Sequence, residues 1–163
     1  RDYRGLPGPG SVIRTPIGAA MAVRREALND IGGFSTRLGR RGTMPAGCEE
    51  TLMGIDLRRR DPSSKIVRDT AFGVSHAVTD DPGFAYFARR CYQEGRSKAI
   101  LSELAGSGEA LSSERRYTTR VLPSGVWRHR RYPTRVVALV AGFVLTCAGY
   151  ASGLVRRGRG VSG

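Results

Sequence analysis

The chain has 163 residues, and its 27 lysines and arginines outnumber its 14 aspartates and glutamates, giving a net charge of +13 at pH 7. Such a balance favours an anionic partner, which could be a membrane surface, a phosphate-bearing substrate or nucleic acid. No nucleic-acid-binding motif accompanies the basic residues and few aromatic residues lie among them, so membrane or phosphate is the preferred interpretation. Its three cysteines are odd in number and widely spaced, which argues against a disulfide framework or a zinc site.

The first third of the sequence predicts a loop, a strand and a short helix. The chain begins with neither an initiator methionine nor a signal peptide, so we expect it to be the C-terminal part of a longer protein. Residues 1–16 are rich in glycine and proline, which predicts a loop. Residues 17–23 are a short run of small apolar residues, which predicts a closely packed buried strand. Residues 24–31 predict a brief helix that Gly32 and Gly33 end as a left-handed cap.

Two adjacent carboxylates, Glu49 and Glu50, follow a basic loop at residues 40–46 and begin an amphipathic pattern. This pattern ends in three arginines before Asp61 and Pro62, which predicts a helix that stops there. Acids at a helix N-terminus are favoured by the backbone dipole, so simple capping is one interpretation of the pair. Adjacent helical residues point about 100° apart, so the two acids cannot serve the same hydroxyl. Glu49 is therefore interpreted as a helix-start acid or as the partner of a loop arginine.

Two short strands are predicted next, at residues 65–68 and 71–76, and the second of them ends in His76. A single histidine at a strand end is usually structural, and a metal ligand is the alternative. The other histidine, His129, lies among arginines and is expected to be solvated.

The remainder of the chain is predicted to be helical. Apolar residues recur at helical spacing from 84 to 104, which predicts a long helix. Residues 106–108 predict a hinge, and residues 112–121 predict another helix that Pro123 stops.

The segment 136–155 contains no charged residue. Twenty helical residues extend roughly 30 Å, which is the thickness of a bilayer core. Arginines on both sides of the segment, with Tyr132 at its border, favour membrane contact, and a buried helix of a soluble protein is the alternative. Gly149 and Gly153 would allow another helix to approach closely.

The order of these segments resembles the C-terminal half of family 2 glycosyltransferases with the GT-A fold. Residues 18–25, followed by residues 31–34, are similar to the glycine-loop strand of that family and the segment after it. Residues 48–50 resemble its acidic motif, which is usually Glu-Asp, and residues 74–76 resemble its C-terminal histidine segment. The similarity covers roughly residues 14–123.

The resemblance implies a set of site residues. Glu50 would be the general base, supported by Glu49, and His76 would help to hold a divalent metal, Mn²⁺ or Mg²⁺. The implied contacts to the donor or the acceptor come from Gly18, Ala19, Arg96 and Lys98, and a solvated helix face is the alternative for the last two.

The sequence departs from the family pattern at three points. Glu50 stands where aspartate is commoner, so its reach is longer by one methylene, and Leu52 stands where the family often has another acid. The chain has no Asp-x-Asp metal motif and no nucleotide-binding half, so by itself it is expected to be an inactive part of an enzyme.

The implied function is transfer of a sugar from a nucleotide-diphosphate donor to an acceptor hydroxyl in cell-envelope, polysaccharide or glycolipid synthesis. A single base and no evident nucleophile favour direct displacement with inversion. The implied partners are the donor, a lipid-linked or saccharide acceptor and the cell membrane, with the catalytic part on the cytoplasmic side and without nucleic acid. A non-catalytic membrane anchor or scaffold is the alternative, and a basic nucleic-acid-binding module is a third interpretation.

The expected fold class is accordingly α/β. Residues 1–105 would be the C-terminal part of a GT-A catalytic domain, and residues 106–135 a basic helical region. Residues 136–155 would be a transmembrane or membrane-docking helix, and residues 156–163 a basic tail.

Overall fold

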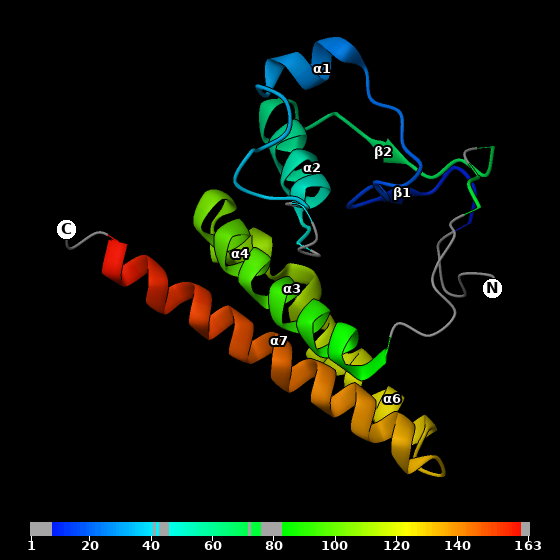
Figure 1. The fold of residues 1–163 in the computed structure, drawn as a ribbon. Helices are drawn as coiled ribbons and strands as arrows, with labels where there is room; N and C mark the ends of the chain where they lie inside the picture. The colour runs from blue at the N-terminus through cyan, green and yellow to red at the C-terminus, as the bar shows by residue number, and fades with distance from the viewer. Residues whose placement is uncertain (1–7, 41, 43–45, 72, 76–82, 161–163) are drawn as a thin grey trace. The chain divides into compact units, whose positions relative to one another are not determined.

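The computed structural model describes residues 8–40, 42, 46–71, 73–75 and 83–160 (Figure 1). The chain divides into two compact units. One consists of Arg1–Ser35 with Glu49–Thr79, and the other consists of Thr36–Cys48 with Asp80–Gly163.

The first unit contains the short helix α1 (Arg25–Asp30), as the sequence predicts. Gly32 and Gly33 follow it with φ angles of 76° and 83°, a conformation that costs glycine little. The backbone N–H of Gly33 donates to the carbonyl oxygen of Leu28 at 2.9 Å, which closes the helix end. The predicted left-handed cap is therefore confirmed.

Helix α2 (Glu49–Arg60) begins at the first of the two acids and ends before Asp61, as predicted. Leu52, Met53 and Ile55 are buried along it. Beyond its end, the Asp61 carboxylate accepts hydrogen bonds from the Ser63 side chain and backbone and from the Ser64 hydroxyl. The Ser63 hydroxyl, then the Ser63 backbone and the Ser64 hydroxyl lower the pKa of Asp61.

The strands differ most from the prediction. Strands β1 (Val12–Ile13) and β2 (Ile66–Val67) pair antiparallel, with Val12 opposite Val67. Strand β1 lies in the segment predicted to be a loop, and β2 is the middle of the strand predicted at 65–68.

Two predicted strands are not found among the described residues. Residues 17–23 form a turn, a bend and irregular chain, and residues 71 and 73–75 form no strand. A strand needs a neighbour for its backbone hydrogen bonds, and the described part of the chain offers these segments none.

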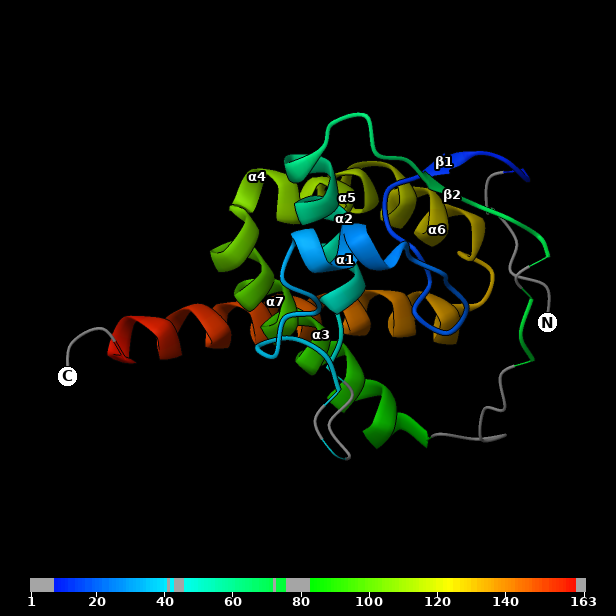
Figure 2. The ribbon, with the colours of Figure 1, turned by 90° about the horizontal axis from the view of Figure 1, so that it is seen from above.

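The second unit is built on helices α3 (Gly83–Ala105) and α7 (Pro133–Gly160), which pack against each other and cross in the view of Figure 2. Both helices were predicted from the sequence, with ends that differ by one to five residues. Glycines lie at the contact because the two backbones approach closely. A Cβ at Gly95 would overlap the carbonyl oxygen of Thr146, and a Cβ at Gly149 would overlap that of Tyr92.

Short helical segments connect α3 to α7: α4 (Ser107–Ala110), α5 (Ser112–Arg116), the π-helical turn η1 (Tyr117–Val121) and α6 (Leu122–Arg128). The predicted hinge is reduced to Gly106, whose φ is 77°, because Ser107 already begins α4. The prediction that Pro123 ends a helix is wrong. It lies in the first turn of α6, where a missing N–H leaves no hydrogen bond unmade.

The expected GT-A α/β fold is not found. The described residues are mostly helical, and their only sheet has two antiparallel strands. An α/β domain requires several strands that pair side by side, and the described residues of the two predicted segments that would have supplied them form no strand. The predicted helix at 136–155 is confirmed as part of α7. Within the described residues one stretch, Pro133–Arg156, is long and apolar enough to cross a membrane by length and composition.

Candidate functional site

The first unit brings together Gly18 and Glu50, which are 32 positions apart in the sequence. Glu50 lies in the first turn of α2, and its carboxylate rests against the α-carbon of Gly18. A Cβ at Gly18 would overlap Oε1 of Glu50 and lie 2.8 Å from its Cδ and 3.1 Å from its Cγ. The space that a side chain would occupy at position 18 is therefore taken by the Glu50 carboxylate.

This site is open to solvent on the glycine side. Gly18 and Ala19 are exposed in a turn that the N–H of Ala20 closes on the carbonyl oxygen of Ile17 at 3.0 Å. Glu50 and its neighbour Glu49 are half-buried. A carboxylate held beside an exposed glycine can accept a proton from a hydroxyl group that approaches over the turn.

Two contacts hold α2 against the segment that leads to this turn. Nη1 of Arg58 donates to the carbonyl oxygen of Arg14 at 2.8 Å. A Cβ at Gly54 would lie 3.0 Å from the same oxygen and 3.1 Å from Cδ1 of Ile66, so α2 packs closely there. Sequence reasoning missed the contact between Arg58 and Arg14. The run of three arginines at the end of α2 indicated only that donors were present there.

The metal ligand expected from the resemblance, His76, lies outside the described residues. Among the residues that the structure describes, no group of three or more His, Cys, Asp or Glu side chains could hold a metal ion. The divalent metal stays a prediction, because the ligand expected for it in this chain lies outside these residues.

The second unit contains an ion cluster around Lys98. The ammonium of Lys98 lies 2.5 Å from Oε1 of Glu94 and 3.0 Å from Oε1 of Glu114. The Sγ of Cys48 donates to the same Glu94 oxygen at 3.8 Å. Burial alone would lower the pKa of Lys98, but the negative charge of Glu94 outweighs it, with contributions from Cys48 and Glu114, and raises the pKa.

Lys98 is therefore not on a solvated helix face, since its side chain is 16% exposed. Its charge is already engaged by two carboxylates, and a phosphate group would have to compete with both of them. Arg96, the other residue predicted for phosphate contact, is half-buried, and its backbone lies near Gly153 of α7. Sequence reasoning missed both ion pairs of Lys98. The pair with Glu94 could have been found, because the two residues have the spacing of a helical ion pair, whereas no such signal indicates Glu114.

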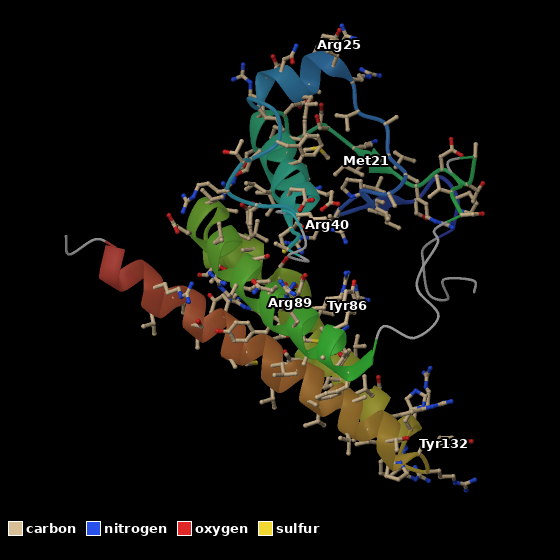
Figure 3. The ribbon with its side chains drawn as sticks, viewed as in Figure 1. Met21, Arg25, Arg40, Tyr86, Arg89 and Tyr132 are labelled. Atoms are coloured by element: carbon tan, nitrogen blue, oxygen red, sulfur yellow. The ribbon has the colours of Figure 1, made fainter. Side chains whose placement is uncertain are left out.

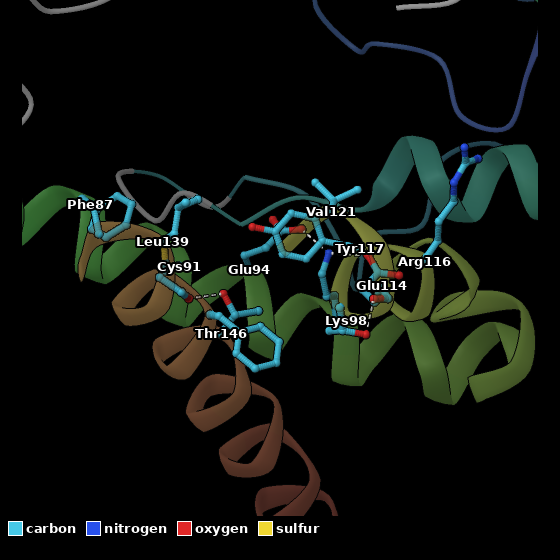
Figure 4. Close-up of a pocket in the computed structure, with 14 residues that line it drawn as sticks. Phe87, Cys91, Glu94, Lys98, Glu114, Arg116, Tyr117, Val121, Leu139 and Thr146 are labelled. Carbon is cyan, nitrogen blue, oxygen red and sulfur yellow. Dashed lines mark hydrogen bonds and ion pairs between the residues drawn. The ribbon is translucent and has the colours of Figure 1, made fainter. Parts of the chain in front are cut away.

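A cavity of about 580 Å³ lies beside this cluster (Figure 4). Helices α3 and α7, with α5 and η1, supply its walls. The ion cluster forms one part of the lining, and apolar side chains form much of the remainder, including Phe87, Tyr117, Val121, Leu139 and Phe143. Burial raises the pKa of the Cys91 thiol, which also lines the cavity.

Replacing Lys98 by methionine should lower the free energy of unfolding by about 1–3 kcal/mol, because Glu94 and Glu114 would then share a partly buried site without their cation. Lys65→Met is the matched control, since Lys65 is exposed. Because the pKa of Lys98 is raised above its ordinary value of 10.5, its contribution is complete below that pH and is lost as the pH rises further. Urea denaturation of both variants measures the difference, and equal losses would mean that the cluster contributes nothing specific.

Comparison of the chain with protein-family models, with curated proteins and with solved structures finds no match.

Proposed function

We propose that this chain is the acceptor-side part of a membrane-associated glycosyltransferase in which Glu50 is the general base. The supporting observation is the approach of the Glu50 carboxylate to Gly18, because these are the two residues that the motif resemblance assigns to one site. The proposal makes no use of the GT-A fold, which the described residues do not have.

In the proposed reaction, an acceptor hydroxyl lies over the turn at Gly18 and donates its proton to the Glu50 carboxylate. The acceptor oxygen attacks the anomeric carbon of the donor sugar as the bond from that carbon to the diphosphate oxygen breaks. The electron pair of that bond leaves with the diphosphate, so the sugar is transferred with inversion. A positioned base typically contributes about 10²–10⁴-fold to such a rate.

The partners in this proposal are a nucleotide-diphosphate sugar and a lipid-linked or saccharide acceptor at the cell membrane. Helix α7 supports the membrane location, because a stretch of it is long and apolar enough to cross a bilayer. Nucleotide sugars are cytosolic, so the catalytic side is placed in the cytoplasm. The divalent metal implied by the resemblance stays a prediction.

A non-catalytic membrane anchor is the second candidate function. It is favoured by the apolar residues that α7 leaves exposed, among them Val137, Val144 and Val155. An anchor would bind membranes whether or not Glu50 is present, whereas a transferase would lose its activity without that residue.

Gly18→Ala should reduce sugar transfer by about tenfold or more while leaving the fold intact. The new methyl group would occupy the position of the Glu50 carboxylate, which is the end of a flexible side chain and can rotate away at little cost. A displaced reacting group can cost up to about 10²-fold in rate. Initial rates and thermal unfolding of the same preparations measure the two effects.

Gly8→Ala is the matched control, because a Cβ at Gly8 meets nothing within 4 Å. Equal activity of the two variants would contradict a catalytic role for the contact between Gly18 and Glu50.

A further inference from the structure

Helix α7 has one apolar side that the second unit leaves uncovered. Within 136–155, the exposed residues other than Ala138, which lines the cavity, recur at intervals of three or four positions and form one stripe along the helix. We call this stripe the outward face; none of its members is polar or charged, and they are Val137, Val140, Val144, Cys147, Ala148, Ala151, Leu154 and Val155.

The opposite side of α7 is covered by α3. A Cβ at Gly142 would lie 3.0 Å from Cζ of Phe87, and a Cβ at Gly153 would lie 2.6 Å from Cβ of Ala99. The contacts advance in the same direction along both helices, so α3 and α7 run in the same direction where they cross. Close approach at small residues is the usual way in which such a pair of helices packs.

This packing decides how α7 can meet a membrane. Gly95 of α3 lies against Thr146, which is at the middle of the apolar segment 136–155. Glu94, Arg96 and Lys98 lie within one turn of Gly95. If α7 crossed a bilayer with α3 in place, these charged residues would lie near its centre, where ionisable groups are most costly.

We infer that α7 lies in the plane of the membrane surface, with its outward face in the acyl-chain boundary and α3 on the aqueous side. A helix of this kind is anchored by its apolar face while its polar surroundings remain hydrated. Tyr86 and Arg89 are exposed on α3 and project away from α7, as Figure 3 shows, which is consistent with an aqueous environment there.

The residues around the start of α7 suit the membrane–water interface. The guanidinium of Arg130 lies 4.3 Å from the ring centre of Trp127, and that of Arg135 lies 4.7 Å from the ring centre of Tyr132. The two aromatic side chains are 71% and 55% exposed. Aromatic and basic residues are enriched at the membrane–water interface. The net charge of +13 favours binding to a membrane surface that contains anionic lipid.

The first test is sedimentation of the full chain with sealed vesicles of phosphatidylcholine, with and without the anionic lipid phosphatidylglycerol. Binding should be more than about tenfold tighter with the anionic lipid, and salt should weaken it. Val144→Asp should reduce binding by about tenfold or more, because it places a charge on the outward face. Ser112→Asp makes the same change of charge away from α7 and should bind as the unchanged chain does.

The results of this test show whether a membrane or a second copy of the chain covers the outward face. Equal binding of the two aspartate variants would overturn the inference. A dimer in the absence of vesicles that Val144→Asp converts to a monomer would assign the outward face to a second copy, and would also overturn it. Circular dichroism of both variants establishes that each is folded.

A second test distinguishes lying on the membrane from crossing it. Thr134→Cys and Ser162→Cys are made separately in a chain whose native cysteines are replaced by alanine. Each variant is labelled with an impermeant maleimide in sealed membrane vesicles from cells. Labelling of both from the same side supports the inference, and labelling from opposite sides overturns it. In the unchanged chain, Cys147 on the outward face should be protected when vesicles bind.

This inference deepens the membrane association proposed above and is independent of sugar transfer. Glu50→Gln should bind vesicles as tightly as the unchanged chain does, so loss of transfer and loss of docking are observed separately.

Discussion

Glu50→Gln should lower the turnover number for sugar transfer by about 10²–10⁴-fold in the protein as the cell makes it, with little change in stability or in the affinity for the donor. The amide has nearly the shape of the carboxylate, so it can fill the same space beside Gly18. It cannot accept the proton of the acceptor hydroxyl, so the contribution of the base is lost. Steady-state kinetics with the donor and the acceptor titrated separately measure the effect.

Glu26→Gln is the matched control, because Glu26 also lies in the first turn of a helix, α1, and is exposed. It should leave transfer unchanged. Near-normal turnover of Glu50→Gln would remove Glu50 as the base. A fall in donor affinity with unchanged turnover would instead assign Glu50 to binding.

The helices were largely predictable from the sequence because their signals are local. The periodicity of α3 and the acids and arginines of α2 lie within those helices, and the glycine pair lies directly after α1. A helix makes its backbone hydrogen bonds within itself, so its sequence is enough to indicate it.

The strands were not predictable in this way. The segment 17–23 is apolar and short enough for a strand, but a strand is completed by a partner elsewhere in the chain. Strand β2 pairs with β1, which lies in a glycine- and proline-rich segment that was predicted to be a loop. The GT-A expectation depended on those strands and is wrong for this reason. Pro123 was misread because a proline can begin a helix as well as end one.

The candidate site was predictable only in part. Gly18 and Glu50 were named because their motifs resemble a family, and no spacing rule brings positions 32 apart into contact. The Glu94–Lys98 pair could have been found from its helical spacing. The approach of Glu114 to Lys98 could not, because it depends on how α5 returns to α3.

Because α3 and α7 pack closely, Gly149→Ala should lower the free energy of unfolding of the second unit by about 3 kcal/mol. This is the upper end of the typical cost of overpacking. A Cβ at Gly149 would overlap the carbonyl oxygen of Tyr92 and lie 2.8 Å from its carbonyl carbon. These are backbone atoms of a helix and cannot rotate away, so the helices must separate. Thermal unfolding followed by circular dichroism should show a fall of about 12–24 °C in the Tm of this unit.

Gly125→Ala is the matched control in α6, because its Cβ would make an ordinary contact of 3.5 Å with Cδ1 of Leu139. Alanine is favoured over glycine in a helix, so this variant should be as stable as the unchanged chain or slightly more stable. Gly95→Ala should destabilise like Gly149→Ala, since it meets the backbone of Thr146 and Tyr150. The double variant should lose less than the sum of the two, because either methyl group alone already forces α3 from α7. A fully additive loss, or a Tm of Gly149→Ala equal to that of the control, would contradict close packing of the two helices.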